Sequence, residues 1–442
     1  MLKTVRNAFK IKDIRNKILF TIMALVIVRI GSLLPAPGVN HDYIAQFFAQ
    51  NFGDGLSFLD SFSGGSFSRM SLFALGIGPY ITSSIIMQLL TIAIPKLEEL
   101  QKDGEDGRKK IAEISRYVTI ALAIIESVAM VIGFGNSGVL EGGLSFQNIV
   151  IITCTFTAGS AFLMWLGEKI TERGVGNGIS IILLINIVAG MPADLAGLYN
   201  TFINGKPVVN GVFAAIIILA VIVFLVVVII ILQDAERKIA VQYAKKVQGR
   251  KMVGGQSSFI PLKVNTAGVM PVIFAVSLMQ FPIIICSMFG IRAERAYFWP
   301  KVLYMLNSQY WFDLDNGAFK YTVGLLIYMA LIVFFAYFYT SITFNPVEVA
   351  SNMKKQGGFI PGIRPGKPTS EYFTKVLNYI IFIGAVMLTI VAVIPIAMSG
   401  LFNAQVSFGG TSIIIIVGVV LETIKQIESQ MLVRHYKGFL ND

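Results

Sequence analysis

The sequence predicts an all-α polytopic membrane protein with ten transmembrane helices in two pseudo-symmetric, inverted five-helix halves and one short re-entrant helix. Three observations support this fold class. Hydrophobic residues make up 55% of the 442 residues, and a mean hydropathy of +0.72 places the chain among membrane proteins. The apolar residues form long uninterrupted runs. One segment, residues 55–69, is too short and too polar to cross a bilayer.

The spans follow from these apolar runs. The first begins after a basic segment and ends without a small-x-small cleavage site, so it is predicted to be an uncleaved span rather than a signal peptide. Arg29 within it is expected to extend toward an outer membrane edge. The ten spans lie near residues 18–35, 70–94, 117–134, 147–167, 179–196, 211–232, 267–290, 321–342, 376–398 and 411–429.

The distribution of basic residues predicts the orientation. Segments on the amino-terminal side of the membrane hold 29 of the 36 Lys and Arg residues, and the opposite loops hold six. Cytoplasmic loops carry the excess of Lys and Arg, so both termini are predicted to be cytoplasmic.

Residues 55–69 follow the first span and are the least regular part of the predicted membrane region. They contain Asp60 and Arg69, several serines, and the pair Gly64 and Gly65. Irregular backbone at membrane depth is tolerated only inside protein or beside water. The segment is therefore expected to fold back into a cavity of the protein, which favours a conduit over a receptor or a lipid-facing enzyme.

The domain organisation follows from the even number of spans. We expect an amino-terminal half, residues 1–200, with five spans and the re-entrant segment. A carboxy-terminal half, residues 201–442, would hold the other five spans with long loops at 233–266 and 343–375. An odd number of spans in each half inverts the second half, as in an inverted repeat.

Motifs for catalysis or cofactor binding are weak. Cys154 and Cys286 lie in apolar runs and are interpreted as core residues, and the two histidines form no metal-binding cluster. The glycines at 362–369 lack the spacing of a phosphate loop, and those at 173–178 predict a tight turn that leads into the fifth span. We therefore expect no metal, no cofactor and no nucleotide site, so that energy for any work must come from a partner.

The long basic loops at 233–266 and 343–375 allow two interpretations. Topology alone explains basic residues on this face. The length of the loops also fits a docking surface for acidic proteins or nucleic acid.

Five motifs in order along the chain closely resemble the SecY family of protein-conducting channels. They are FALGIGPYITSSIIMQLL at 73–90, GVGNGIS at 174–180, LKVNTAGVMP at 262–271, GFIPGIRPG at 358–366 and FGGTS at 408–412. Together they cover nearly the whole chain. The resemblance implies an hourglass-shaped channel, without enzymatic activity, through which unfolded secretory proteins cross and from which transmembrane helices leave sideways into lipid.

The resemblance also implies site residues. A ring at the narrowest point of the pore corresponds to Ile81, Ile85, Leu183, Ile187, Ile273 and Ile415, where the family often has isoleucine in place of Leu183. A plug that closes the pore corresponds to residues 55–69, including Leu56, Phe58, Leu59, Phe62, Gly64, Gly65 and Phe67. A polar cluster at the lateral gate corresponds to Thr91, Glu126 and Asn265, although the family position of Glu126 is not always acidic.

Partners and location follow from the same resemblance. Arg364, together with Arg250 and Lys251, is expected to dock the SecA motor or the ribosome, including its RNA. SecE and SecG are implied as membrane subunits, signal peptides and nascent chains as passengers, and lipids as the surroundings. The expected location is the bacterial cytoplasmic membrane.

Two other function classes remain as alternatives. A secondary transporter for a small solute would also suit ten spans, but it needs coupling carboxylates, and Glu126 is the clearest carboxylate within a span. A membrane-embedded protease or lipid transferase would need paired catalytic residues, which the spans lack.

Overall fold

The computed structural model describes the chain except residues 1, 41–42, 45–59, 61, 136–138, 142, 205–206, 244–245, 249–250, 254–256, 289–297, 307–310, 312–321, 403–409 and 439–442. Helices dominate the described residues, which agrees with the predicted fold class. The helices of the first half are α1 (Leu2–Lys10), α2 (Lys12–Leu33), α5 (Gly78–Ala93), α6 (Pro95–Lys102), α7 (Glu105–Gly135), α8 (Phe146–Arg173) and α9 (Gly178–Phe202).

The second half contains α10 (Val208–Asp234), α11 (Met270–Met288), α12 (Phe298–Leu306), α13 (Val323–Thr343), α14 (Pro346–Lys355), α15 (Lys367–Phe402) and α16 (Gly410–Gly438). Every predicted span overlaps a helix. Within the described residues, seven helices are long and apolar enough to cross a membrane, or eight if the bent pair α5 and α6 forms one span.

The second predicted span differs from the prediction. An intact helix was expected from Met70, but turns occupy residues 70–77 and α5 begins only at Gly78. Met70 and Gly76 have φ angles of 42° and 56°, which are incompatible with a continuous right-handed helix. At its other end α5 meets α6 at a bend of 100° beside Pro95. Apolar composition thus placed the segment in the membrane region but misplaced the start of the helix.

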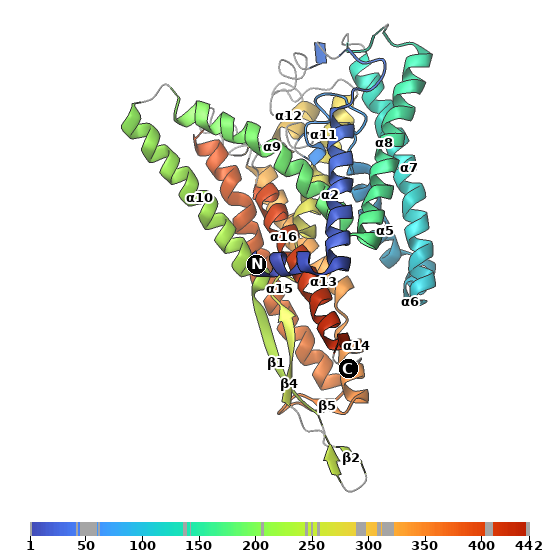
Figure 1. Cartoon of the computed structure of the whole chain (residues 1–442), viewed down its shortest axis with the longest axis vertical. Helices are drawn as coiled ribbons and strands as arrows, with labels where there is room; N and C mark the ends of the chain where they lie inside the picture. The colour runs from blue at the N-terminus through green and yellow to red at the C-terminus, as the bar shows by residue number, and fades with distance from the viewer. Residues whose placement is uncertain are drawn as a thin grey trace.

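A small β-structure joins the two long basic loops, and the sequence analysis did not predict it. Strand β1 (Glu236–Tyr243) pairs with β4 (Ser257–Lys263) and with β5 (Gly358–Phe359), antiparallel in both cases. A separate hairpin pairs β2 (Lys246–Gln248) with β3 (Lys251–Val253). Figure 1 shows β1 and β4 beside the lower ends of the helices of the second half, and the hairpin with β2 projecting below them.

Buried and exposed side chains alternate along β1, and the buried ones anchor the sheet to the helices. Ile239 and Val241 are buried, and they pack with Leu262 and with Phe373 of α15 in one apolar cluster. Side chains that alternate between the two faces of a strand allow one face to be apolar while the other carries charge. The loops at 233–266 and 343–375 therefore form one connected structure.

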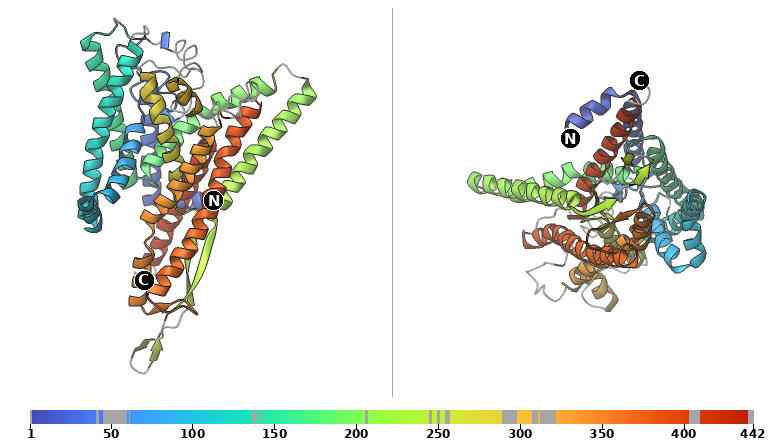
Figure 2. Two further views of the ribbon diagram at one scale, coloured as in Figure 1. Left: turned by 180° about the vertical axis from the view of Figure 1, so that it is seen from behind. Right: turned by 90° about the horizontal axis from the view of Figure 1, so that it is seen from below.

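The largest apolar cluster fills the centre of the helix bundle. It draws residues from α2, α8, α9, α10, α11, α13, α15 and α16. Helix α10 leans away from the other helices in both side views (Figures 1 and 2). Only 17% of the most apolar stretch of this helix is buried. Helix α16 runs down toward the side from which the β2 hairpin projects, whereas α1 lies near the mid-height of the molecule (Figure 1).

The predicted tight turn before the fifth span is confirmed. Gly176 has a φ of +80°, and Asn177 caps α9 by accepting hydrogen bonds from the backbone N–H groups of Ile179 and Ser180. An Asn cap satisfies amide groups that the first turn of a helix leaves unpaired. The turn fixes where α9 enters the bundle, and α9 carries two of the predicted ring residues.

Candidate functional site

The six predicted ring residues lie together in the central cluster, and we call this group the waist. Leu183 and Ile187 of α9, Ile273 of α11 and Ile415 of α16 are at most 5% exposed. The half-buried side chains of Ile81 and Ile85 on α5 pack against the same cluster. Four helices from both halves of the sequence therefore contribute these residues to one apolar cluster.

A hollow of about 420 Å³ lies directly against the waist. Ile81, Leu183 and Ile273 contribute its apolar wall. The rest of the lining is largely polar and reaches the side of the molecule that carries the strands, where Lys425 Nζ lies 2.6 Å from Asp234 Oδ1. The polar lining residues include Gln88, Asn177, Ser180, Gln233, Lys263, Asn265, Glu422 and Lys425. The arrangement is a polar vestibule that ends at an apolar constriction.

The predicted plug is described at Asp60 and at residues 62–69, which we call the plug segment; Leu56, Phe58 and Leu59 lie outside the described residues. The plug segment is folded by its own side chains. The Asp60 carboxylate accepts hydrogen bonds from the Ser68 N–H, at 2.8 Å, and from the Ser68 hydroxyl, at 3.0 Å. Ser63 Oγ accepts a hydrogen bond from the Phe67 N–H. Gly64 and Gly65 have positive φ angles of 68° and 82°.

The plug segment packs between two apolar clusters. Phe62 lies against the central cluster that contains the waist. Phe67 packs against a second cluster on the other side and forms an edge-to-face contact with Phe134, their ring centroids 6.4 Å apart. The plug segment therefore contacts two apolar clusters, one of which contains the waist residues.

Arg29 makes a contact that the sequence analysis did not predict. Its guanidinium Nη1 donates a hydrogen bond to the Gly64 carbonyl oxygen at 3.0 Å. Asn186 of α9 donates from Nδ2 to the Phe62 carbonyl oxygen, also at 3.0 Å. A contact with a backbone carbonyl leaves no pattern in the sequence, so neither contact was predicted.

The three predicted gate residues do not hydrogen-bond to one another in the described structure. The Thr91 hydroxyl donates to the Met87 carbonyl within α5, and Asn265 Nδ2 donates to the Gly268 carbonyl. Glu126 is half-buried on α7. The expected hydrogen-bonded cluster is thus absent here, because local backbone acceptors satisfy two of its members. Thr91 does line a second hollow, of about 350 Å³, between α5 and α7.

Gln88 is a polar residue that the sequence analysis missed. It lines both hollows, and its Oε1 atom is buried without a hydrogen-bond partner. The sequence feature that indicated this residue is a glutamine within a largely apolar span. Polar groups inside membranes are often functional. It lies one helical turn from Ser84, which lines the same two hollows.

The predicted docking residues lie on the side of the strands. Arg364 is exposed on the turn before α15, and its carbonyl accepts a hydrogen bond from the buried Thr369 hydroxyl at 2.8 Å. This bond fixes the turn from which the Arg364 side chain extends. Lys251 begins β3 at the tip of the projecting hairpin, and Arg250 lies outside the described residues.

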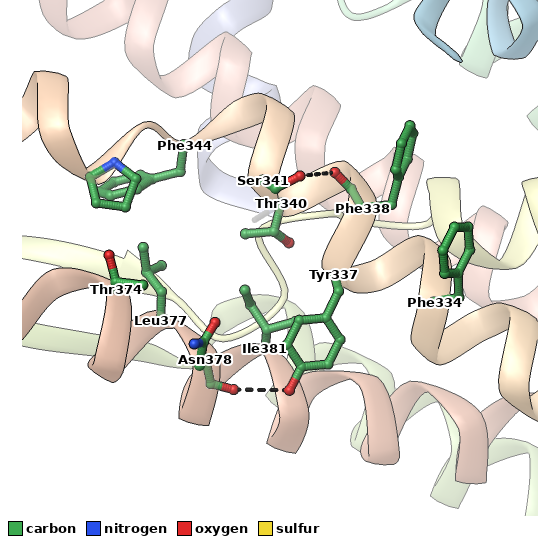
Figure 3. A pocket seen from close by; sticks show the side chains of 11 residues that line it. Phe334, Tyr337, Phe338, Thr340, Ser341, Phe344, Thr374, Leu377, Asn378 and Ile381 are labelled. Carbon is green, nitrogen blue, oxygen red and sulfur yellow. Dashed lines mark hydrogen bonds between the residues drawn. The ribbon is translucent and has the colours of Figure 1, made fainter. Parts of the chain in front are cut away.

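A third hollow, of about 470 Å³, lies between α13 and α15 (Figure 3). Aromatic side chains form much of its lining, and the Tyr337 hydroxyl donates to the Asn378 carbonyl across it at 3.2 Å (Figure 3). None of the predicted site residues lines this groove. The groove is therefore separate from the waist and its vestibule.

Sequence comparisons assign this arrangement to a known family. The SecY family model matches residues 71–424. A protein translocase subunit SecY from Halalkalibacterium halodurans is 44% identical over 450 residues, and one from Streptomyces coelicolor is 44% identical over 455 residues. Both matches cover the full length of each chain.

Solved structures share the fold at lower identity. A protein-conducting channel is 19% identical with a TM-score of 0.65, and the match covers 94% of this chain and 92% of the other. Two further structures each give a TM-score of 0.60 with the same coverage. They are a SecY protein whose plug domain stabilises the closed state, at 18% identity, and Sec61 in a canine ribosome-channel complex, at 17%.

Proposed function

Because the chain belongs to the SecY family, we propose that unfolded secretory proteins cross the membrane through the waist formed by α5, α9, α11 and α16. The chain is a pore subunit of the Sec translocon and a multi-span protein of the bacterial plasma membrane. The observation that supports the proposal is that six branched apolar side chains, from both halves of the sequence, belong to the central cluster, and that three of them line one hollow.

The chemistry of the waist suits a pore that must pass polypeptide but retain ions. A narrow apolar constriction gates by excluding water, and it offers an ion no replacement for its hydration shell. Branched side chains contact a passing chain through non-directional dispersion forces, which do not depend on its sequence. The polar vestibule would keep an unfolded chain hydrated until it reaches the waist.

Plug and waist act in series in this proposal. The segment at residues 55–69 closes the pore on one side of the waist and leaves when a polypeptide enters. The described part supports this role because it contacts the central cluster through Phe62 and is held by few contacts. Segments that move in function are drawn from the less stable parts of a structure.

A lateral gate would open between α5 and α7 on one side and α11 and α13 on the other. Helix α11 packs against both α7 and α13, which supports a seam at this position. Thr91, Glu126 and Asn265 would line the seam. Polar contacts between membrane helices contribute about 0.6–2 kcal/mol each, so an entering apolar signal helix can displace them.

The energy for transport would come from partners docked on the strand-bearing side. Arg364, Arg250 and Lys251 would bind the SecA motor or the ribosome, and basic tips suit both acidic proteins and RNA. The ribosome-bound Sec61 relative supports a ribosome partner. SecE and SecG are proposed as membrane subunits, and both termini would face the cytoplasm.

The two proposed halves, residues 1–200 and 201–442, would move as units. Their shared contact surface includes the waist, because α5 and α9 belong to the first half and α11 and α16 to the second. Small rotations of one half against the other would widen the waist without unfolding either one.

Reconstitution in lipid vesicles tests the function. The complex of the chain with its membrane subunits should move an unfolded preprotein into the vesicle lumen when SecA and ATP are supplied. The measured quantity is the fraction of preprotein protected from added protease. Uptake of a small solute along an ion gradient, without protection of the preprotein, would instead favour a secondary transporter.

A further inference from the structure

Side chains from two helices hold the plug segment through hydrogen bonds to its backbone. Arg29 of α2 donates to the Gly64 carbonyl, and Asn186 of α9 donates to the Phe62 carbonyl, each at 3.0 Å. The two donors come from positions 157 residues apart in the sequence, yet they hold carbonyls only two residues apart. Asn186 precedes the waist residue Ile187, so the hold is applied next to the constriction.

We propose that Arg29 and Asn186 form a polar latch that keeps the plug segment closed, and that this latch must open before the segment can leave. The inference rests on the proposed function of the segment as a plug. Neither residue belongs to the waist or to the gate, and each acts as a positioning residue for the plug.

Gly64 fits the latch closely. A Cβ atom at this position would lie 2.7 Å from Arg29 Nη1 and 3.0 Å from both Cα and Oδ1 of Asn186. These distances are shorter than ordinary contacts, so Gly64 brings the backbone within reach of both donors. Gly65 provides a natural comparison, because its φ of +82° is similar but a Cβ there would meet nothing within 4 Å.

The chemistry of the latch explains both its hold and its release. A hydrogen bond from a charged guanidinium is roughly twice as strong as a neutral one. The two bonds can nevertheless be lost one after the other, before the apolar contacts of Phe62 and Phe67 separate. The bonds between Asp60 and Ser68 lie within the plug segment, and they can persist while the latch opens. The segment can therefore leave as a folded unit.

The latch also favours closure after transport. When the plug segment leaves, the Arg29 guanidinium loses the carbonyl that it contacts at membrane depth. Unpaired charge within the membrane region is costly. Return of the Gly64 carbonyl removes this cost, so Arg29 acts both to hold the plug and to draw it back.

The test compares Gly64→Ala with Gly65→Ala in the complete complex, reconstituted in vesicles. Resting ion leak and SecA-driven preprotein export are measured for both. Alanine at a positive φ strains the backbone in both variants, but only Gly64→Ala adds a collision with Arg29 and Asn186. We expect the leak to rise roughly tenfold for Gly64→Ala, the factor that loss of a charged hydrogen bond produces, and clearly less for Gly65→Ala. Equal leaks would overturn the latch.

A second set of variants distinguishes the latch from a general structural effect. Arg29→Ala should raise the leak, and Arg29→Lys, which keeps a charged donor, should restore part of the closure. Combining Arg29→Ala with Gly64→Ala should add little, because both remove the same contact. Fully additive leaks, or no difference between the Ala and Lys variants, would contradict the proposal even if Gly64→Ala failed to fold.

Preprotein export, measured in the same vesicles, distinguishes a failure of the latch proposal from a failure of the proposed function. Preprotein export should persist in all latch variants, since none lies in the waist or the docking surface. Loss of export by the unaltered complex would refute the proposed function. Normal export together with unchanged leak in every variant would refute only the latch.

Discussion

The waist and the plug segment lie side by side but are held by different forces. The waist consists of branched apolar side chains in the central cluster, and Ile415 among them is fully buried. The plug segment carries serines and glycines, and side-chain hydrogen bonds to two of its backbone carbonyls hold it in place. The waist depends on packing, whereas the plug segment adds directional hydrogen bonds to the packing of Phe62 and Phe67.

This difference separates two tasks of a protein-conducting channel. Dispersion contacts are individually weak and do not require a fixed geometry, so the waist can widen and close again around a passing chain. A hydrogen bond weakens steeply when its geometry is lost, so the plug is either docked or released. The waist should therefore set how well an occupied pore seals, and the plug should set how often an empty pore opens.

The largest expected effect comes from a change that touches neither barrier. Arg364→Glu reverses the charge of an exposed side chain on the docking surface. Like charges placed together across an interface cost several kcal/mol, so SecA-driven export should fall on the order of a hundredfold. Resting ion leak should stay normal, and Arg364→Lys should retain more export than the glutamate variant. Normal export by the glutamate variant would remove Arg364 from the docking site.

Deletion of residues 55–69 sharpens the comparison by removing one barrier completely. Resting leak should rise more than in any latch variant, by more than about tenfold, because all plug contacts are lost together. Export should change much less, since the waist still surrounds the passing chain. The measurements are vesicle conductance and protease protection of the preprotein. A deletion that abolished export without raising leak would assign the segment a role other than closure.

Ile415→Asn weakens the other barrier. Burying an amide without a hydrogen-bond partner costs about 1–3 kcal/mol, which favours an open waist by about tenfold. Poorly matched signal sequences should then be exported more readily, and leak should rise. Ile415→Leu conserves volume and should leave both properties near normal. If signal stringency and leak both stayed unchanged in the asparagine variant, Ile415 would not belong to the constriction.

The smallest effect is expected at the gate. Glu126 forms no hydrogen bond to Thr91 or Asn265 among the described residues, so Glu126→Gln replaces the carboxyl group by an amide without breaking a bond between them. A polar contact between membrane helices averages about 0.6 kcal/mol, which corresponds to about a threefold change. The measurement is the export of preproteins with graded signal hydrophobicity. A change above tenfold would show that Glu126 controls the gate more strongly than its contacts indicate.

The sequence was informative where apolar length or motif order carried the information. Runs of apolar residues predicted ten spans, each of which overlaps a helix, and the motifs selected six ring residues that all belong to the central cluster. Apolarity was a poor guide to the start of α5, because residues 70–77 are apolar yet form turns. Apolar composition indicates that a segment lies within the membrane. It does not reveal the φ angles by which Met70 and Gly76 depart from helical geometry.

Other features had weak or no sequence signals. The alternation of Ile239 and Val241 in β1 is short and lies within a charged loop, so the sheet was missed. The contacts of Arg29 and Asn186 are made to backbone carbonyls distant in sequence, and no residue pattern indicates such an acceptor. The gate residues were selected as a set, but two of them found local acceptors instead of one another.

Site-directed photocrosslinking to a preprotein arrested during export tests the central claim most directly. A photoreactive side chain at Ile273, in the waist, should crosslink strongly to the arrested chain. The same group at Phe382 of α15, which is 56% exposed, provides the control position. The account predicts crosslinks at Ile273 and few at Phe382. Crosslinks that are absent at Ile273, or equally strong at Phe382, would show that the polypeptide does not cross through the waist.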